Sequence, residues 1–429
     1  MSGIIVNNVA RASGTIAATP GGLDWSTAVV TGSTVTVEAG KGYFINTTSN
    51  ACTVTLPASA DPGDQIVLAD YARKWATNAV TIDINGNNFQ GSSDDFTVNY
   101  DTAGQSLNIV YADSTNGWLP VSDDAVAFDH SPPPTQRGII AFGNAPNDAV
   151  SNLSNLISSS GVVATDQTGV GTARKVIGAA GYGGDKAIFA FGTTGSVSNL
   201  SNLVNNSGTV QSDTSGVGSA RRSLAAADYG YDKSIFAFGF TNAATGISNL
   251  VNNVGTVQSD VSAVGTARYG LAGNTYGGDK AIFAYGYTNA MVSMSNLVSN
   301  SGVIASDVSG VGTARDGLMS CGFGGDKAIF AYGMPGGSGN YVSTRNLVSN
   351  TGVVAADASG AGTARANGAA CSYGGDKGIF VRGTSVVDGS GYWHSISNLV
   401  NNSGVIGSDV TGVGTAQEGP AASGYSISA

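Results

Sequence analysis

The chain has 429 residues, of which 63 are glycine and only 11% are charged, and its formal net charge is −10 at pH 7. This composition excludes long surface helices, and the lack of any basic stretch leaves no electrostatic basis for binding nucleic acid. No run of 18 or more apolar residues is present, and the first 25 residues lack the basic-then-apolar profile of a signal peptide, so we expect no membrane partner.

The first 121 residues are predicted to form a β-rich part. Residues 1–30 are rich in glycine, alanine and threonine and have weak periodicity, which predicts an N-terminal arm that is disordered alone or packs on a partner. Residues 31–121 contain short alternating stretches at about ten-residue spacing, as in a β-sandwich or barrel. The expected strands are 34–37, 42–46, 53–56, 65–68, 80–84 and 107–111. Residues 1–130 hold thirteen acidic and four basic side chains, a formal −9, so nearly all of the net charge lies here.

Residues 122–136 interrupt the alternation and are predicted to be a linker. They include three consecutive prolines, Pro132, Pro133 and Pro134. A run of prolines favours an extended and stiff backbone. We therefore expect a spacer between two separately folded parts.

From Arg137 to the end, one unit is repeated six times. Each copy contains an Asn-Leu pair, and Gly, Asp and Arg follow six, eleven and nineteen residues after that Asn. In the last copy Gln417 replaces the Arg. A glycine-rich turn with a Lys lies twelve residues beyond each Arg. The period of 47 to 52 residues without helix signals predicts four-stranded blades, and six copies predict a six-bladed β-propeller over 137–429. The Asn-Leu pairs lie at 155–156, 202–203, 249–250, 296–297, 346–347 and 398–399.

The register of the two ends predicts how this domain closes. Ala429 stands twelve residues after Gln417, where the other copies have Lys, and the first copy begins at Arg137 in that same register. We expect the first blade to take three strands from 137–173 and its innermost strand from 419–425, so that Tyr425 pairs with the strand at 138–143. Such a closure removes the exposed edges that an open sheet would leave.

The side chains that recur in nearly every copy are predicted to be structural. Arg and Asp are expected to form ion pairs between blades or to cap turns, because a catalytic or metal site would not be repeated six times. Cys321 and Cys371 occupy one repeat position and are expected to be small packing residues.

Variation between the copies is confined to one connection, between the second and third strands. The Lys-to-Asn separation there is 18, 16, 16, 16, 19 and 21 residues, counted from Arg137 in the first copy. Functional variation in repeat proteins commonly lies on one face in this way. The two longest connections are predicted to be loops at 336–341 and 388–394. Their Tyr341, Tyr392, Trp393 and His394 lie beside glycines and are a candidate platform for a sugar ring or a protein surface. The alternative is that these side chains only pack against the rim.

Several blocks of the first 121 residues resemble a module of bacteriophage tail-fibre and virion-appendage proteins, especially those of marine phages. The repeats resemble kelch propellers in their glycine-bearing hairpin, their Ile-Phe-Ala-Phe/Tyr-Gly strand and their Thr-Ala-Arg, although they lack the kelch Trp. The resemblance implies a virion structural protein that attaches by its N-terminal part, as a homotrimer, and displays a propeller. The matching blocks are 39–48, 53–58, 62–64, 68–72, 85–86, 109–111 and 117–118.

An enzyme is not expected, and neither is a cofactor or a metal. The chain has two histidines, His130 in the linker and His394, so a multi-histidine metal site is excluded and no Ser/His/Asp arrangement can be assigned. Two functions remain for a protein located in the virion, in its tail or another appendage. In the first, the propeller binds a host-surface glycan or protein. In the second, the chain is a purely architectural decoration or adaptor that contacts only other virion or tail proteins.

Overall fold

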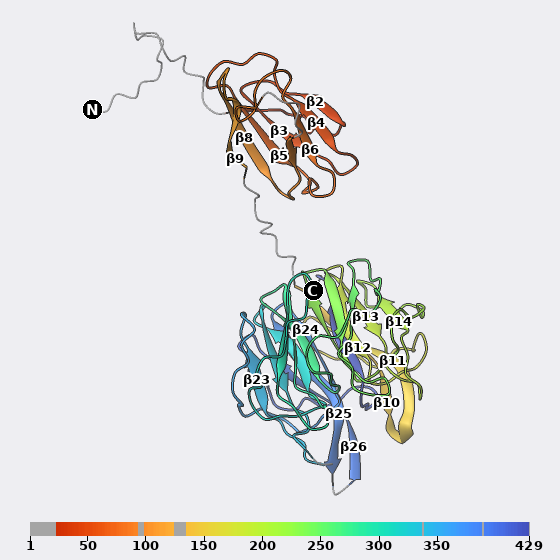
Figure 1. The fold of residues 1–429 in the computed structure, drawn as a ribbon. Coiled ribbons are helices and arrows are strands. Elements are labelled where there is room, and N and C mark those ends of the chain that lie inside the picture. The colour runs from red at the N-terminus through yellow and green to blue at the C-terminus, as the bar shows by residue number, and fades with distance from the viewer. Residues whose placement is uncertain (1–22, 93–97, 124–133, 337–338, 388–389, 429) are drawn as a thin grey trace, which may run out of the picture. The chain divides into compact units, whose positions relative to one another are not determined.

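The computed structural model describes residues 23–92, 98–123, 134–336, 339–387 and 390–428. The chain divides into two compact units, Met1–His130 and Ser131–Ala429 (Figure 1). Strands make up 45% of the structure and helix 1%, so the predicted all-β class is confirmed.

The N-terminal unit contains two sheets. One has five strands in the order β1 (Asp24–Trp25), β3 (Lys41–Ile45), β5 (Gln65–Asp70), β8 (Ser106–Asp113) and β9 (Gly117–Ser122). The other has four, in the order β2 (Thr34–Thr36), β4 (Cys52–Thr55), β6 (Val80–Asp83) and β7 (Val98–Tyr100). All six expected strands are present, and β1, β7 and β9 are additional. Both sheets bury alternate side chains in one shared core that includes Val54, Leu68, Ile82, Leu107 and Trp118.

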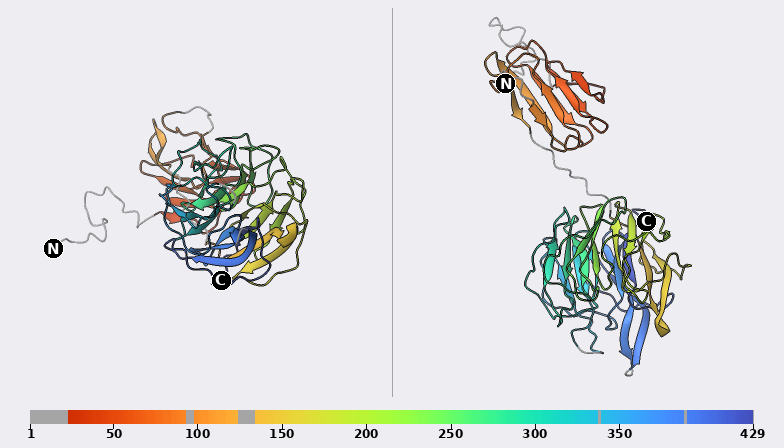
Figure 2. Two further views of the ribbon diagram at one scale, coloured as in Figure 1. Left: turned by 90° about the horizontal axis from the view of Figure 1, so that it is seen from below. Right: turned by 45° about the vertical axis from the view of Figure 1, so that its right-hand side comes forward.

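The C-terminal unit contains six antiparallel sheets, here called sheets 1 to 6, one for each copy of the repeat. Each has three strands, and in Figure 2 the six sheets surround a common centre. Sheet 1 is β27 (Ala421–Tyr425), β10 (Arg137–Ala145) and β11 (Ala149–Ile157), with a 3₁₀ turn at Pro146–Asp148. Sheet 2 is β12 (Gly178–Tyr182), β13 (Lys186–Ala190) and β14 (Ser201–Val204). Sheet 3 is β15 (Ala225–Tyr229), β16 (Lys233–Ala237) and β17 (Ser248–Val251). Sheet 4 is β18 (Ala272–Tyr276), β19 (Lys280–Ala284) and β20 (Ser295–Val298). Sheet 5 is β21 (Met319–Phe323), β22 (Lys327–Ala331) and β23 (Arg345–Val348). Sheet 6 is β24 (Ala369–Tyr373), β25 (Lys377–Val387) and β26 (Ser390–Val400).

The expected fourth strand of each copy is not formed as a strand. In sheet 4 the segment after β20 makes only two isolated bridges, Val298↔Ile304 and Ser295↔Val308. Between them the buried Asn296 donates from Nδ2 to Ala305 O and to Asp307 Oδ1, both at 2.9 Å. This side chain takes the place of a ladder hydrogen bond, so the segment follows β20 with an irregularity in the pairing.

Sheet 1 joins the two ends of the repeat region as predicted. The strand β27 pairs with β10 over five positions, from Arg137↔Tyr425 to Ala141↔Ala421. Tyr425 is buried in the core between sheets 1 and 2. The C-terminal strand therefore gives β10 a hydrogen-bonded neighbour on the side that would otherwise be an open edge.

A closed cycle of backbone hydrogen bonds links all six sheets. In each copy one N–H donates to the equivalent carbonyl of the preceding sheet at 2.7 to 3.0 Å, and Val176 N donating to Gly419 O completes the cycle. All six residues have φ between 50° and 65°, a conformation that costs a β-branched residue such as Val176 about 1 kcal/mol or more. The cycle takes one residue from each copy, just before the first strand of its sheet, and so links the six copies to one another. The six residues are Val176, Ser223, Gly270, Gly317, Asn367 and Gly419.

The middle strands have apolar sequences and are buried between neighbouring sheets. In β13 only Lys186 is accessible, and the rings of successive sheets pack edge to face or tilted, with Phe142 and Phe189 centroids 5.5 Å apart. Cys321 and Cys371 are buried, and burial raises the pKa of Cys371 to about 12. Its thiol stays protonated, in keeping with the predicted packing role.

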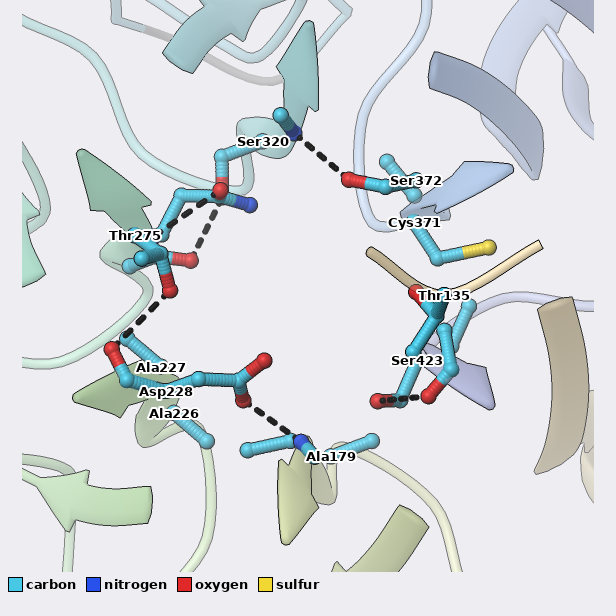
Figure 3. Close-up of a pocket in the computed structure, with 18 of the residues that line it drawn as sticks. Thr135, Ala179, Ala226, Ala227, Asp228, Thr275, Ser320, Cys371, Ser372 and Ser423 are labelled. Atoms are coloured by element: carbon cyan, nitrogen blue, oxygen red, sulfur yellow. Dashed lines mark hydrogen bonds between the residues drawn. The ribbon is translucent and has the colours of Figure 1, made fainter. Parts of the chain in front are cut away.

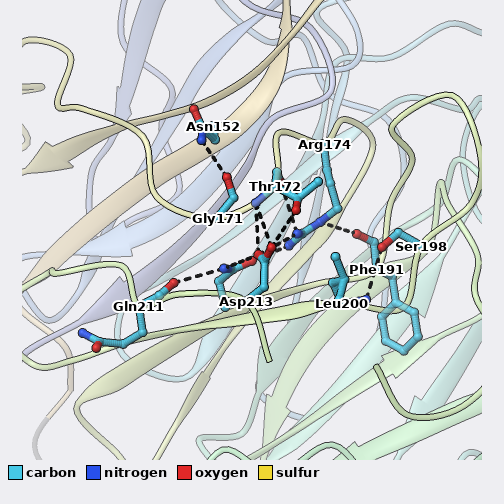
Figure 4. A network of polar contacts seen from close by, with 10 residues as sticks. Asn152, Gly171, Thr172, Arg174, Phe191, Ser198, Leu200, Gln211 and Asp213 are labelled. Atoms are coloured by element: carbon cyan, nitrogen blue, oxygen red, sulfur yellow. Dashed lines mark hydrogen bonds and ion pairs between the residues drawn. The ribbon is translucent and has the colours of Figure 1, made fainter. Parts of the chain in front are cut away.

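The recurring Asp side chains bind the neighbouring sheet. Asp213 accepts hydrogen bonds from the backbone N–H and the Oγ1 of Thr172, the latter at 2.6 Å, and from Asn202 Nδ2 at 2.9 Å (Figure 4). Burial by itself raises the pKa of Asp213, but these hydrogen bonds and the charge of Arg174 outweigh it and lower the pKa below its ordinary value. The same contacts recur for Asp166, Asp260, Asp307, Asp357 and Asp409.

The recurring Arg side chains cross the same interfaces. Arg174 is fully buried and donates from Nε to Phe191 O at 3.0 Å and from Nη2 to Asn202 Oδ1 at 2.5 Å, while Nη1 lies 3.5 Å from Asp213 Oδ1. The guanidinium also stacks over Phe142, whose ring centroid is 4.8 Å from the guanidinium carbon. Asp and Arg therefore have the predicted structural role between sheets.

The interface between sheets 6 and 1 carries an exchange of residues. Gln417 stands where the other copies have Arg, and Arg382 stands where they have an aromatic residue. Arg382 is buried, donates to Gln417 Oε1 and Asn155 Oδ1, and lies 3.8 Å from Asp166 Oδ1. At the other five interfaces the guanidinium belongs to the recurring Arg and lies over the aromatic residue. At this interface the guanidinium belongs to Arg382, which occupies the aromatic position. The aromatic residues of the other five copies are Phe142, Phe191, Phe238, Tyr285 and Tyr332.

Candidate recognition face and central cavity

The connections between second and third strands lie opposite the side on which the chain enters the C-terminal unit. Gly374 and Gly375, in the turn that precedes β25, donate to the carbonyls of Gln136 and Thr135 at 2.9 and 3.2 Å. The second strands start at these turns and end on the other side. We call that side the insertion face and define it by residues 142–153, 191–200, 238–247, 285–294, 332–344 and 382–396.

The connections on the insertion face take two forms. In sheets 2 to 4 they are compact, with Thr193 bridged to both Lys175 and Val197 in sheet 2. In sheets 1 and 6 the strands continue as longer hairpins, paired as far as Ala145↔Ala149 and Val387↔Ser390. The β25–β26 hairpin extends away from the end of the unit where the C-terminus lies (Figures 1 and 2).

The expected loop at 388–394 is therefore wrong for most of its length. Tyr392 and Trp393 pair with Ser385 and Thr384, and His394 pairs with Gly383, all within strands. The insertion includes three β-branched residues, Thr384, Val386 and Val387, which favour a strand. They continue the ladder and lengthen the hairpin. Residues 388–389 lie outside the described part of the chain.

The four candidate residues differ in their exposure. Tyr392 is 52% exposed, Trp393 and Tyr341 are half-buried, and His394 is buried. His394 Nε2 lies 2.6 Å from Ser385 Oγ, and the Tyr392 ring packs edge-on against it at 4.8 Å. Burial and then the charge of Arg365 lower the pKa of His394, which keeps the imidazole neutral at pH 7. His394 supports Tyr392 from beneath and is not itself on the surface.

The two longest insertions are adjacent. A Cβ atom at Gly339 would stand 3.5 Å from Val386 Cγ2, so the connection of sheet 5 touches the hairpin of sheet 6. This contact brings the segment with Tyr341 beside the hairpin with Tyr392. The exposed Tyr392 ring, on a projecting hairpin, can stack on a sugar ring or pack on an apolar protein surface.

A central cavity of about 510 Å³ lies among the first strands of all six sheets (Figure 3). Small side chains line it, as expected for strands crowded at the centre, and Thr135 contributes from the entry segment. Neighbouring strands are joined across the wall by hydrogen bonds from Thr275 Oγ1 to Asp228 O and from Ser320 Oγ to Gly273 O. These hydroxyl groups therefore provide hydrogen bonds to backbone carbonyls of the neighbouring strands.

Asp228 is the acidic residue on these first strands, and sequence analysis did not single it out. Its carboxylate accepts a hydrogen bond from Gly181 N at 2.5 Å, and burial raises its pKa to about 6 from an ordinary value of 3.8. Aligning the copies would have revealed it, because the equivalent positions hold only Gly, Thr or Ser. These positions are Gly181, Thr275, Gly322, Ser372 and Gly424.

Asp228→Asn is expected to change how stability depends on pH. A raised pKa means that the folded state binds this proton more tightly, so its contribution is complete below pH 4 and is lost as pH rises through about 6. The loss is about 3 kcal/mol for a shift of this size. The unfolding temperature of the variant minus that of the wild type should therefore increase from pH 4 to pH 7. A difference that does not vary with pH would contradict a raised pKa of Asp228 in the folded state.

Comparison with known proteins adds no identification. No family model matches the chain, and no curated protein is similar to it. Within the described ranges, no three His, Cys, Asp or Glu side chains are grouped so as to hold a metal ion. No helix in the part of the chain that the structure describes is long and apolar enough to cross a membrane.

Proposed function

We propose that this chain is a structural protein of a phage virion, a tail fibre or other appendage, that recognises the host surface. It attaches by its N-terminal region and displays residues 137–429 as a six-bladed, kelch-like β-propeller. The observation that carries the proposal is that every change in repeat length falls on the insertion face, opposite the side where the chain enters.

The propeller part of the proposal is supported by the pairing of the ends. Six three-stranded sheets and the cycle of six backbone hydrogen bonds repeat once in each copy, as a ring of six blades requires, and the β10–β27 pairing connects the first and last copies. Full closure is one of the ways in which all-β proteins avoid exposed sheet edges. An extracellular structural role would benefit from such closure, because open edges promote aggregation.

The recognition part is supported by the contrast between framework and insertions. The framework residues Asn155, Asp166 and Arg174 and their counterparts are engaged in contacts between sheets, so they are unavailable to a ligand. Tyr392 lies outside that framework, is exposed and is held by His394. Rings presented in this way suit a host glycan or an apolar protein patch, with roughly 1–3 kcal/mol for each stacked ring.

Changing both Tyr392 and Trp393 to Ala is expected to lower adsorption of the purified full chain to host cells at least tenfold. The reason is the loss of the stacking energy of the two rings, since each loss of roughly 1.4 kcal/mol lowers the affinity tenfold. The measurement is the amount of labelled protein bound to cells as a function of concentration. Tyr231→Ala is the matched control, because Tyr231 is also an exposed tyrosine, 39% accessible, but lies in a turn at the entry side.

Equal adsorption by the double variant and the wild type, with unchanged thermal unfolding, would favour the second candidate function. In that case the chain is an architectural decoration or adaptor that contacts only virion or tail proteins. The exposed, stacked rings of Trp25 and Phe44 on the N-terminal unit are the observation that favours this candidate.

A further inference from the structure

The outer faces of the two N-terminal sheets differ in chemistry. The four-stranded sheet directs Thr53, Thr55, Thr81, Asp83 and Asn99 away from the core, since their neighbours in sequence are buried. Thr55 Oγ1 donates to Asp83 Oδ2 at 3.0 Å, and Thr81 Oγ1 donates to Asn99 Oδ1 at 2.8 Å. This is the polar outer face expected of a sheet with one side in water.

The five-stranded sheet has the opposite character. Alternation with the buried residues of β3, β5, β8 and β9 directs mainly apolar side chains outward, and no Asp, Glu, Lys or Arg stands at these positions. The amides of Gln65 and Asn108 bond to each other at 2.8 Å. We call this the apolar outer face, and its outward residues are Gly42, Phe44, Gln65, Val67, Ala69, Ser106, Asn108, Val110, Ala112 and Leu119.

An ordered aromatic cluster lies at one edge of the apolar outer face. Trp25 stacks on Phe44 with centroids 4.6 Å apart, and Tyr71 packs edge-on against Phe44 at 6.3 Å. The three side chains are 40%, 38% and 56% exposed. Gly42 allows this arrangement, because a Cβ there would stand 2.6 Å from the Trp25 ring. Three large apolar side chains held together at the surface are typical of an interface.

We propose that the apolar outer face is a self-association surface, covered by the same face of a second copy of this chain. The distribution of charge on the N-terminal unit favours a second copy as the molecule that covers this face. Residues 1–130 carry thirteen acidic and four basic side chains, so two copies repel each other on most approaches. The apolar outer face lacks charged side chains, so two copies can meet there without like-charge repulsion and with matching apolar surfaces.

This inference deepens the proposed function, since it rests on the virion appendage proposed above and names a surface through which two copies of the chain associate. It can nevertheless fail separately. A monomeric protein that still adsorbs to host cells would overturn self-association and leave host recognition standing. An oligomer that does not adsorb would do the reverse.

The test is sedimentation velocity of the full chain over a concentration series. Phe44→Asp places a charge in the aromatic cluster of the apolar outer face, and Thr36→Asp places the same charge at an exposed strand position of the polar outer face. We expect the wild type and Thr36→Asp to associate and Phe44→Asp to be monomeric, with a dissociation constant raised roughly a hundredfold or more. Thermal unfolding should be nearly equal for the three, and Trp25→Ser serves if Phe44→Asp does not fold.

Two results would overturn the proposal. One is a wild type that is monomeric at every concentration, and the other is equal association of the Phe44→Asp and Thr36→Asp variants. A chain lacking residues 1–22 identifies the competing occupant. If that chain associates while the full chain does not, the N-terminal residues of the same copy cover the face, and the second copy does not.

Discussion

Arg382→Phe is expected to destabilise the C-terminal unit by roughly 3 kcal/mol, and adding Gln417→Arg is expected to restore most of that loss. The single change leaves Asn155, Asp166 and Gln417 without the guanidinium that now lies between them. Removing one partner of a buried ionic contact is costly because the other remains buried and unpaired. The double variant instead reproduces the aromatic-and-Arg pair of the other five interfaces, where Arg174 stacks over Phe142.

Chemical unfolding of the four proteins of this double-mutant cycle measures the coupling. Gln417→Arg alone should also be destabilising, since it buries a second guanidinium beside Arg382 with no further carboxylate. A double variant that is less stable than both single variants would contradict the exchange. The backbone is suited to it, because Arg382 has a φ of 60° and the five aromatic residues have 61° to 66°.

Removal of residues 420–429 is expected to open the C-terminal unit at sheet 1. The deletion removes β27, its five paired positions on β10 and the buried Tyr425, a loss of roughly 5 kcal/mol or more. The measurement is limited proteolysis with thermal unfolding, and we expect new cleavage within β10 and β11 and a lower, broader transition.

Two controls separate opening from general damage. Removing only the last three residues keeps β27 and the hydrogen bond from Ser426 N to Asp185 O, and should change little. Adding a synthetic peptide of residues 417–429 to the shortened chain should restore protection of β10. If the ten-residue deletion behaves like the three-residue one, the C-terminal strand does not close the unit.

The arrangement of the six copies could be predicted because it depends on spacing. Constant separations between Asn, Asp, Arg and Lys imply equivalent positions, and the shared register of Arg137 and Ala429 led to the pairing of Tyr425 with β10. The fourth strand was predicted wrongly. Alternation indicates a strand, but it does not reveal that a side chain such as Asn296 replaces a backbone partner.

The candidate site was predicted less well, for reasons of geometry. Glycines around Tyr392 and His394 indicated a loop, whereas pairing across the hairpin turned the insertion into strands and buried His394. The compensation of Gln417 by Arg382 was also missed. The two residues are 35 apart in sequence, and their relation depends on which sheets are neighbours. Three strands of the N-terminal unit were missed as well, because β1 and β7 are short and β9 contains Pro120.

The most direct test of host recognition is an exchange of the longest insertion. Replacing residues 383–396 by the nine residues 192–200 shortens the Lys377-to-Asn398 separation from 21 to 16 and keeps Arg382. Binding of the labelled full chain to host cells is then compared with that of a protein in which 239–247 is replaced by 192–200, a change of sequence at constant length. We expect at least a tenfold loss of binding for the shortened hairpin only, at an unchanged unfolding temperature. Equal binding by both proteins would contradict this expectation.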